Sequence, residues 1–157
     1  MRRIAYVLLL LAACSRASEQ PGGQPSPDED APINASVAGG AIQGVVRGDV
    51  ISFKGIPYAA PPVGNLRWRP PQPVAPWPGG RAAREYGNDC VQSVLPGDAA
   101  ASGARQDEDC LVLNVWAPNP NGSSVRHPVL VWFHGGGFVN GAASIPFFDG
   151  SSFARQG

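Results

Sequence analysis

Apolar and polar residues are grouped along the chain in short blocks, which predict strands separated by loops. Residues 128–134 are the clearest block, because an unbroken apolar run follows a proline there. A run without a polar face is typical of a strand that is buried on both faces. Residues 111–116 predict another strand, and residues 37–47 and 50–54 predict a hairpin with a tight turn between them.

The segments between these blocks predict loops and one short helix. Residues 57–78 are rich in proline, which is compatible with neither a helix nor a central strand. Their tryptophans are expected to pin this extended segment to the body of the protein. Residues 91–109 are rich in Gly, Ala, Ser and Asp and predict a loop. Residues 149–156 predict a short helix, capped by Asp149 or a neighbouring serine and ended by Gly157.

The first 13 residues have the layout of a signal peptide: Arg2 and Arg3 precede a short apolar run and small residues. The run is too short to be a membrane-spanning helix. It ends in Leu-Ala-Ala-Cys14, which resembles the lipobox of bacterial lipoproteins. The resemblance implies cleavage before Cys14, a diacylglycerol on its side chain and an acylated new N-terminus, which together give a stable membrane anchor. The alternative is an ordinary secretory signal in which Cys14 is incidental.

Composition divides the rest of the chain into two parts. Residues 14–35 contain almost no apolar side chains and predict a flexible linker after the lipidated cysteine. Residues 36–157 are expected to form one domain, and the 20 glycines and 17 prolines of the chain favour strands and loops in it. Twelve basic and twelve acidic residues give zero net charge. Nucleic-acid binding is therefore not expected, and contact with a membrane is expected through the anchor alone.

The cysteines predict a disulfide. If Cys14 carries lipid, Cys90 and Cys110 remain. An even pair in an exported protein favours a disulfide over two reduced, buried thiols, which is the alternative. Closing a loop of this size stabilises a fold by about 3 kcal/mol when the effect is chain entropy.

The chemistry centres on His134-Gly135-Gly136-Gly137-Phe138, directly after the predicted buried strand. Three glycines let the backbone turn sharply and present bare N–H groups to a ligand. Ester hydrolysis requires such donors, because attack on the carbonyl places negative charge on its oxygen; losing one donor raises the barrier by about 3 kcal/mol. An element of this kind supplies part of the oxyanion hole of lipases and esterases. The alternative is a flexible turn between a strand and a helix.

Other segments extend this pattern, and the chain resembles the type B carboxylesterases from about residue 37 to residue 157. The order and spacing of the segments are those of the family, which is more specific than any single motif. The resemblance implies an α/β fold, namely the N-terminal portion of an α/β-hydrolase fold, in which a small antiparallel β start leads into a mostly parallel central sheet that is incomplete here. The matching segments are Phe53-Lys54-Gly55-Ile56-Pro57-Tyr58-Ala59, Pro61-Pro62-Val63-Gly64, Leu66-Arg67-Trp68, Pro71-Gln72-Pro73, Trp77 and Glu108-Asp109-Cys110-Leu111-Val112-Leu113-Asn114-Val115-Trp116.

The resemblance also implies roles for particular residues. His134 is expected to brace the glycine loop by a hydrogen bond, and His127 to be an exposed loop residue. No metal or cofactor is implied, and the oligomeric state is left open. The implied pairs are Gly136 and Gly137 as backbone N–H donors to the oxyanion, Cys90 and Cys110 as the first disulfide of the fold, and Arg67 with Glu108 as an ion pair that braces the start of the central sheet.

One departure from the family bears on the substrate. Cholinesterases of this family carry a tryptophan in the first disulfide loop, where it binds a quaternary ammonium group by cation–π attraction. Residues 91–109 contain no aromatic residue. We therefore expect a small-molecule carboxylic ester rather than a choline ester as the preferred substrate.

The nucleophile is the other departure. No Gly-x-Ser-x-Gly elbow occurs in the chain, because Ser124 and Ser152 each have a glycine two positions before but none two positions after. The sequence thus predicts a carboxylic ester hydrolase, lipid-anchored in the cell envelope or else secreted or periplasmic, whose Ser nucleophile lies beyond residue 157. This chain alone is expected to be inactive. The alternatives are an inactive truncated remnant or lipid-anchored binding protein, and an unrelated β-rich adhesion lipoprotein.

Overall fold

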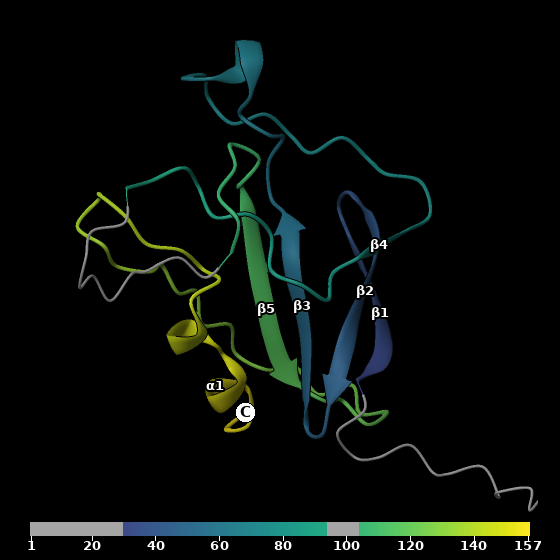
Figure 1. Ribbon diagram of the computed structural model, residues 1–157. Coiled ribbons are helices and arrows are strands. Elements are labelled where there is room, and N and C mark those ends of the chain that lie inside the picture. Colours follow the sequence, from purple (N-terminus) through teal and green to yellow (C-terminus); the bar gives the residue numbers. More distant parts are fainter. Residues whose placement is uncertain (1–29, 94–103) are drawn as a thin grey trace, which may run out of the picture.

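A twisted, mainly antiparallel sheet forms the body of the protein, and the C-terminal segment lies beside it (Figure 1). The computed structural model describes residues 30–93 and 104–157. The strands follow one another in space as β1-β2-β3-β5, and β4 pairs in parallel with β2. The strands are β1 (Ala31–Val37), β2 (Gly40–Arg47), β3 (Val50–Pro57), β4 (Gly80–Ala82) and β5 (Val112–Pro118).

The first three strands form a meander with two tight turns. The hairpin between β2 and β3 turns at Gly48-Asp49 as predicted, and Arg47 pairs with Val50 across it. Two expectations at the start of the chain are wrong. Residues 37–47 are not one strand, because the chain turns back after Val37 and begins β2 at Gly40. Residues 31–35 lie in β1 rather than in the linker, because their backbone pairs along β2 and Ile33 packs partly buried against the core.

The main hydrophobic cluster lies where β2 and β3 meet the residue that follows β4. Ile42, Phe53, Ile56 and Ala83 are almost fully buried there. Trp77 packs against this cluster and donates its indole N–H to the carbonyl of Ala41 over 2.9 Å. Trp77 therefore pins the proline-rich segment to the sheet, as predicted.

The other tryptophan of that segment behaves differently. Trp68 follows the short 3-10 helix η1 (Gly64–Leu66) and has a fully exposed side chain. Its φ of 60° lies in the left-handed region, which few residues other than glycine adopt. The expectation that both tryptophans pin the segment is wrong for Trp68, because its ring is exposed to solvent and is not part of the core cluster.

The predicted strand at residues 111–116 is confirmed as β5, which pairs antiparallel with β3. The register shifts between Phe53 and Ile56, where β3 carries a bulge. Asn114 fills this irregularity: its Oδ1 accepts a hydrogen bond from the backbone N–H of Gly55 over 3.0 Å, and its Nδ2 donates to the carbonyl of Ala143 over 3.1 Å. One side chain thus connects the sheet to the segment that follows the glycine-rich loop.

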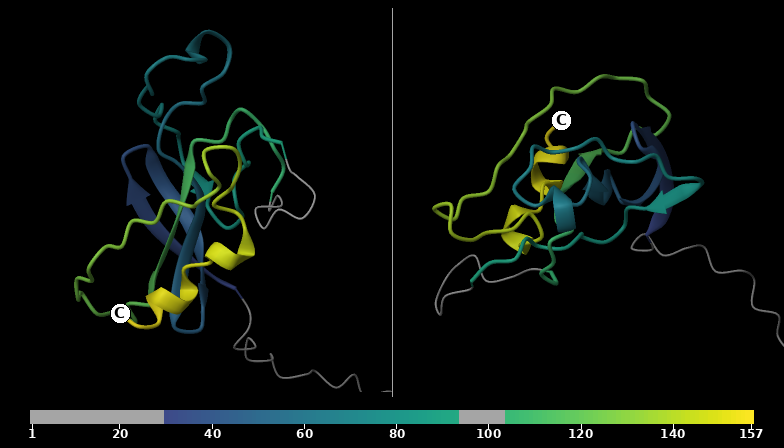
Figure 2. Two further views of the ribbon diagram at one scale, coloured as in Figure 1. Left: turned by 90° about the vertical axis from the view of Figure 1, so that its left-hand side faces the viewer. Right: turned by 90° about the horizontal axis from the view of Figure 1, so that it is seen from above.

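The predicted buried strand at residues 128–134 is wrong for this structure. No strand is formed there, and Val129 and Phe133 are 86% and 85% exposed. Figure 2 shows the yellow-green trace of this region as an arc that stands away from the sheet. An apolar run becomes a central strand only when strands pair with it on both sides, and no described residue forms a ladder with this segment.

The predicted C-terminal helix is confirmed, although it is shorter than expected. It is α1 (Ser151–Ala154), preceded by the 3-10 helix η2 (Pro146–Phe148). Gly150 rather than Asp149 or a serine occupies the N-cap, and Asp149 Oδ1 accepts a hydrogen bond from the N–H of Ser151 over 2.9 Å. Within residues 30–93 and 104–157, no helix combines the length and the apolar composition needed to cross a membrane.

Candidate functional site

The glycine-rich segment from His134 to Gly141 forms a closed turn, which we call the glycine loop. The carbonyl of Gly136 accepts hydrogen bonds from the N–H groups of Val139 and Asn140, over 3.0 and 3.2 Å. The backbone passes through positive φ at Gly136 (133°) and Gly137 (60°). The loop is therefore held by its own backbone, with the bend at the two glycines expected to act on substrate.

Close backbone approach explains why two of the positions in this loop are glycine. A Cβ built on Gly136 would lie 1.7 Å from the carbonyl oxygen of Asn140. A Cβ on Gly141 would lie 2.5 Å from the carbonyl oxygen of Gly135 and 2.6 Å from His134 Nδ1. The sharp closure of the loop thus depends on the absence of side chains at both ends of the turn.

The bend leaves hydrogen-bond donors available. Among the described residues, no hydrogen bond uses the backbone N–H of Gly136 or Gly137. Gly136 is partly exposed and Gly137 is exposed, so both groups can reach an external acceptor. Successive backbone N–H groups in such a turn form a concavity suited to an anionic oxygen. Chemically, this bend can stabilise negative charge that develops on a carbonyl oxygen.

His134 lies at the start of the loop and braces it, as its position suggested. Its Nδ1 lies 2.9 Å from the carbonyl oxygen of Gly135, so the tautomer protonated at Nδ1 donates a hydrogen bond to that carbonyl. Its ring stacks on Phe148 at a centroid distance of 6.4 Å. His127 is exposed in the preceding loop. Among the described residues, neither the His134 ring nor the His127 ring is hydrogen-bonded to a serine.

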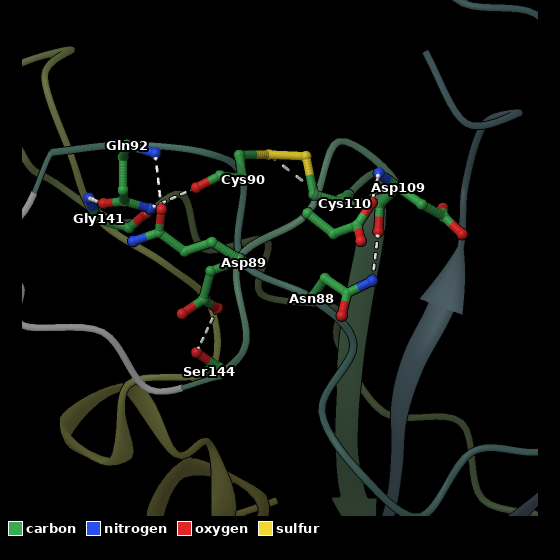
Figure 3. Close-up of a disulfide and its surroundings, with 10 residues drawn as sticks. Asn88, Asp89, Cys90, Gln92, Asp109, Cys110, Gly141 and Ser144 are labelled. Atoms are coloured by element: carbon green, nitrogen blue, oxygen red, sulfur yellow. Dashed lines mark hydrogen bonds between the residues drawn. A yellow bond between two sulfur atoms is a disulfide. The ribbon is translucent and has the colours of Figure 1, made fainter. Parts of the chain in front are cut away.

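A disulfide joins Cys90 and Cys110, with an S–S distance of 2.02 Å (Figure 3). It closes the segment expected to be a loop and connects the start of that segment to β5. Cys14 lies outside the described residues.

Asp89, next to the disulfide, is a buried residue whose hydrogen bonds connect several segments. This role was not predicted from the sequence. Its side chain is 4% exposed and accepts hydrogen bonds from Ser144 Oγ and from the N–H of Ala104, the latter over 2.9 Å. Its backbone pairs with Arg105 and Asp107. Asp89 thereby ties both arms of the disulfide loop to the segment after the glycine loop, as Figure 3 shows for Ser144.

Gln92 makes the contact that links the disulfide to the glycine loop. Its Nε2 donates to the carbonyl of Gly141 over 2.9 Å, and the N–H of Gly141 donates to its Oε1 over 2.6 Å. Figure 3 shows the two residues side by side. The sequence offered no signal for this contact, because a glutamine in a polar loop is unremarkable until the fold brings Gly141 beside it.

The expected Arg67–Glu108 ion pair is present beside the disulfide. Arg67 donates from Nε and Nη2 to Glu108 Oε2, over 3.0 and 2.6 Å. The hydrogen bond to Glu108, and then its charge, raise the pKa of the Arg67 guanidinium. Both side chains are more than 40% exposed, so solvent screens the pair and its effect on stability is small. The pair joins the residue after η1 to the segment that precedes β5, and its expected role of bracing the start of the central sheet stays a prediction.

The expected site residues fall into two neighbouring groups. Gly136 and Gly137 form the bend of the glycine loop, whereas Arg67 and Glu108 line an open hollow next to the disulfide. Gln92 lies between the groups and contacts both of their supporting segments. In the part of the chain that the structure describes, no three His, Cys, Asp or Glu side chains are arranged to hold a metal ion.

Comparison with known proteins provides a family context. The sequence profile of the Carboxylesterase family matches residues 30–157. The fumonisin B1 esterase of Sphingopyxis macrogoltabida is 47% identical over 120 residues, which cover 75% of this chain and 21% of that protein. The cholinesterase of Mus musculus is 37% identical over 161 residues, which cover 96% of this chain and 25% of that protein.

Solved structures show the same similarity. A PNB esterase structure superposes with a TM-score of 0.72 at 40% identity, covering 78% of this chain and 25% of the other. This similarity confirms the expected fold class, the N-terminal portion of an α/β-hydrolase fold. The chain spans between 21% and 25% of the length of these three proteins.

Proposed function

Because the chain belongs to the Carboxylesterase family, we propose that it forms part of a type B carboxylesterase and contributes the oxyanion loop to the hydrolysis of carboxylic esters. One observation carries the proposal: the bend at Gly136 and Gly137 offers backbone N–H groups that no described residue occupies. In acyl transfer, such fixed donors are aimed at the oxygen that becomes negatively charged in the transition state.

In this reaction, Gly136 and Gly137 contribute only the stabilisation of the oxyanion. A serine, deprotonated by a histidine that a carboxylate orients, attacks the ester carbonyl, and the C=O bond opens to an oxyanion. The N–H groups of Gly136 and Gly137 stabilise that oxyanion until the alcohol leaves, and again when water releases the acid. The serine is not among these 157 residues, because they contain no Gly-x-Ser-x-Gly elbow.

The substrate class follows from the relatives and from one sequence feature. The relative from Sphingopyxis macrogoltabida is named an esterase, which supports a small-molecule carboxylic ester. The mouse relative is named a cholinesterase, but residues 91–109 of this chain offer no aromatic ring for a quaternary ammonium group. A choline ester is therefore not proposed as the preferred substrate.

The location proposed for the enzyme is the cell envelope. Residues 1–13 have the layout of an export signal, and Cys14 follows a lipobox-like sequence. Lipid on Cys14 would hold the domain at a membrane surface, with the polar residues before β1 as the tether. An export route also suits the disulfide between Cys90 and Cys110.

Hydrolysis of p-nitrophenyl esters by the purified product of the whole gene tests this function. We expect turnover that an organophosphate abolishes stoichiometrically, since a nucleophilic serine attacks its phosphorus, displaces its leaving group and becomes phosphorylated. Residues 14–157 alone are expected to show no turnover, because they lack the nucleophile. Absence of ester hydrolysis by the whole gene product would overturn the proposal and favour a lipid-anchored binding protein instead.

A further inference from the structure

The contact between Gln92 and Gly141 has the geometry of a clamp on the glycine loop. A primary amide has one acceptor and two donors in a plane, so it can pair with both polar groups of a peptide backbone. Gln92 does this with Gly141, accepting over 2.6 Å and donating over 2.9 Å. Two hydrogen bonds of opposite direction fix both the distance and the orientation of the Gly141 backbone.

Fixing Gly141 also fixes the start of the glycine loop. The α-carbon of Gly141 approaches the carbonyl of Gly135 and the ring of His134 so closely that a Cβ could not be accommodated. Gly135 immediately precedes the bend at Gly136 and Gly137. A displacement of Gly141 therefore moves Gly135 and His134, which lie directly before the oxyanion donors Gly136 and Gly137.

Gln92 is itself held in place by the disulfide loop. Its backbone N–H donates to Gln106 Oε1 over 3.1 Å, and its Nε2 also donates to the carbonyl of Cys90 over 3.0 Å. Cys90 is fixed by its disulfide to Cys110, and the adjacent Asp89 is buried. Gln92 therefore belongs to a segment that the disulfide cross-links, and its side chain is held in place rather than free on the surface.

We propose that Gln92 is a positioning residue, which fixes the glycine loop so that Gly136 and Gly137 meet the oxyanion in the transition state. The inference rests on the proposed esterase function and adds a residue to its machinery. Gln92 makes no contact with the N–H groups of Gly136 and Gly137 among its described hydrogen bonds, so it acts through Gly141.

The expected effect is on the chemical step. A misplacement of about 1 Å in catalytic groups lowers the rate about 100-fold. Because the oxyanion exists only in the transition state and not in the bound ester, loss of positioning lowers kcat and leaves KM nearly unchanged. If Gln92 served folding alone, its loss would lower stability and the amount of active enzyme. It would not lower kcat selectively while leaving KM unchanged.

The test uses Gln92→Met in the protein that the whole gene encodes, because methionine keeps the length of glutamine and lacks its polar atoms. Gln72→Met is the matched control, since Gln72 is exposed and its side chain bonds only the nearby carbonyl of Pro70. We expect kcat per titrated active site to fall by about 10- to 100-fold in Gln92→Met, with KM within about twofold. Affinity for a trifluoromethyl ketone transition-state analogue should fall in parallel, and Gln72→Met should match the wild type.

Two outcomes in Gln92→Met would overturn the proposal. One is an unchanged kcat per active site. The other is a fall in kcat in which the affinity for the substrate is lost as much as the affinity for the transition-state analogue. Amide hydrogen exchange separates this failure from failure of the proposed function. The N–H of Gly141 donates to Gln92, so its exchange should accelerate in Gln92→Met and not in Gln72→Met. If the wild-type protein hydrolyses no ester, the esterase assignment fails, and unchanged exchange at Gly141 would refute the clamp independently.

Discussion

Gly136 faces the backbone carbonyl of Asn140 so closely that a Cβ on Gly136 would lie 1.7 Å from that oxygen. This contact closes the turn that presents the two candidate oxyanion donors. The same turn has open space at Gly135, where no atom lies within 4 Å of a built Cβ. Neighbouring glycines of one motif therefore differ sharply in their tolerance of a side chain, and this difference can be measured.

Gly136→Ala should lower ester hydrolysis by the whole gene product by at least about 100-fold, because the turn must open and the donors move. Gly135→Ala, which adds the same methyl group next to it, should retain most of the activity. Initial rates with a p-nitrophenyl ester, normalised to titrated active sites, check the pair. Equal losses in the two variants would contradict the role of the Gly136–Asn140 contact.

Asn114→Ala should destabilise the protein by about 1–3 kcal/mol, because the N–H of Gly55 in the β3 bulge loses its acceptor. The carbonyl of Ala143 loses its donor at the same time. Asn34→Ala is the control, since the side chain of Asn34 makes one exposed hydrogen bond, to Gln43, and its loss should change stability by less than about 0.5 kcal/mol. Urea unfolding midpoints measure the difference, and similar midpoints for both variants would show that Asn114 does not hold the bulge.

Asp149 should make stability depend on acid pH. Partial burial raises the pKa of Asp149, but hydrogen bonds from Ser151 and the charge of Lys54 outweigh burial, so its pKa is lowered on folding. A lowered pKa in the folded state contributes stability that is present above the unfolded pKa, about 3.9, and is lost as the pH falls through the folded value. We therefore expect the melting temperature to fall more steeply below pH 4 in the wild type than in Asp149→Asn. Parallel curves for the two proteins between pH 6 and pH 3 would contradict this.

Removal of the disulfide by Cys90→Ala with Cys110→Ala should lower the free energy of unfolding by about 3 kcal/mol. The bond should appear as one cross-linked peptide in a non-reducing digest of the purified protein. Cys14→Ser, which leaves this bond intact, is the stability control. A digest in which Cys90 and Cys110 are recovered as free thiols would contradict the pairing.

Cys14→Ser should also release the protein from the membrane fraction, because serine cannot carry the thioether-linked lipid. In cells fed an alkyne-labelled fatty acid, the wild type should acquire label and the variant should not. An unlabelled wild type that is recovered in the soluble fraction would leave Cys14 as an incidental residue of an ordinary export signal.

Local sequence patterns predicted several elements correctly, including one whose pairing partner is distant in sequence. The β2–β3 hairpin follows from short β-type stretches on either side of the turn residues Gly48-Asp49, and β5 follows from its apolar run. The glycine loop also follows from local chemistry, since its closest contacts are made within eight residues from His134 to Gly141.

Features that depend on distant partners escaped prediction or were predicted wrongly. The apolar run at residues 128–134 requires strands on both sides, and the described part of the chain supplies neither. Gln92 and Asp89 acquire their roles only when the fold brings Gly141 and Ser144 beside them. Trp68 and Trp77 lie in the same proline-rich segment, but Trp77 packs against the core cluster whereas Trp68 is exposed, and composition does not distinguish them.

The position of β5 in the sheet also has a kinetic consequence. The β1–β2–β3 meander joins neighbours in sequence, whereas Pro57 at the end of β3 must find Val112 at the start of β5 across a long connection. Pairing of such high contact order is slow, because loop-closure entropy is lost before any ladder bond forms. The Cys90–Cys110 disulfide, with a sequence separation of 20, closes part of that connection into a loop. A chain that is oxidised before β5 docks therefore has a shorter effective loop to close, and it should complete its sheet faster than the reduced chain.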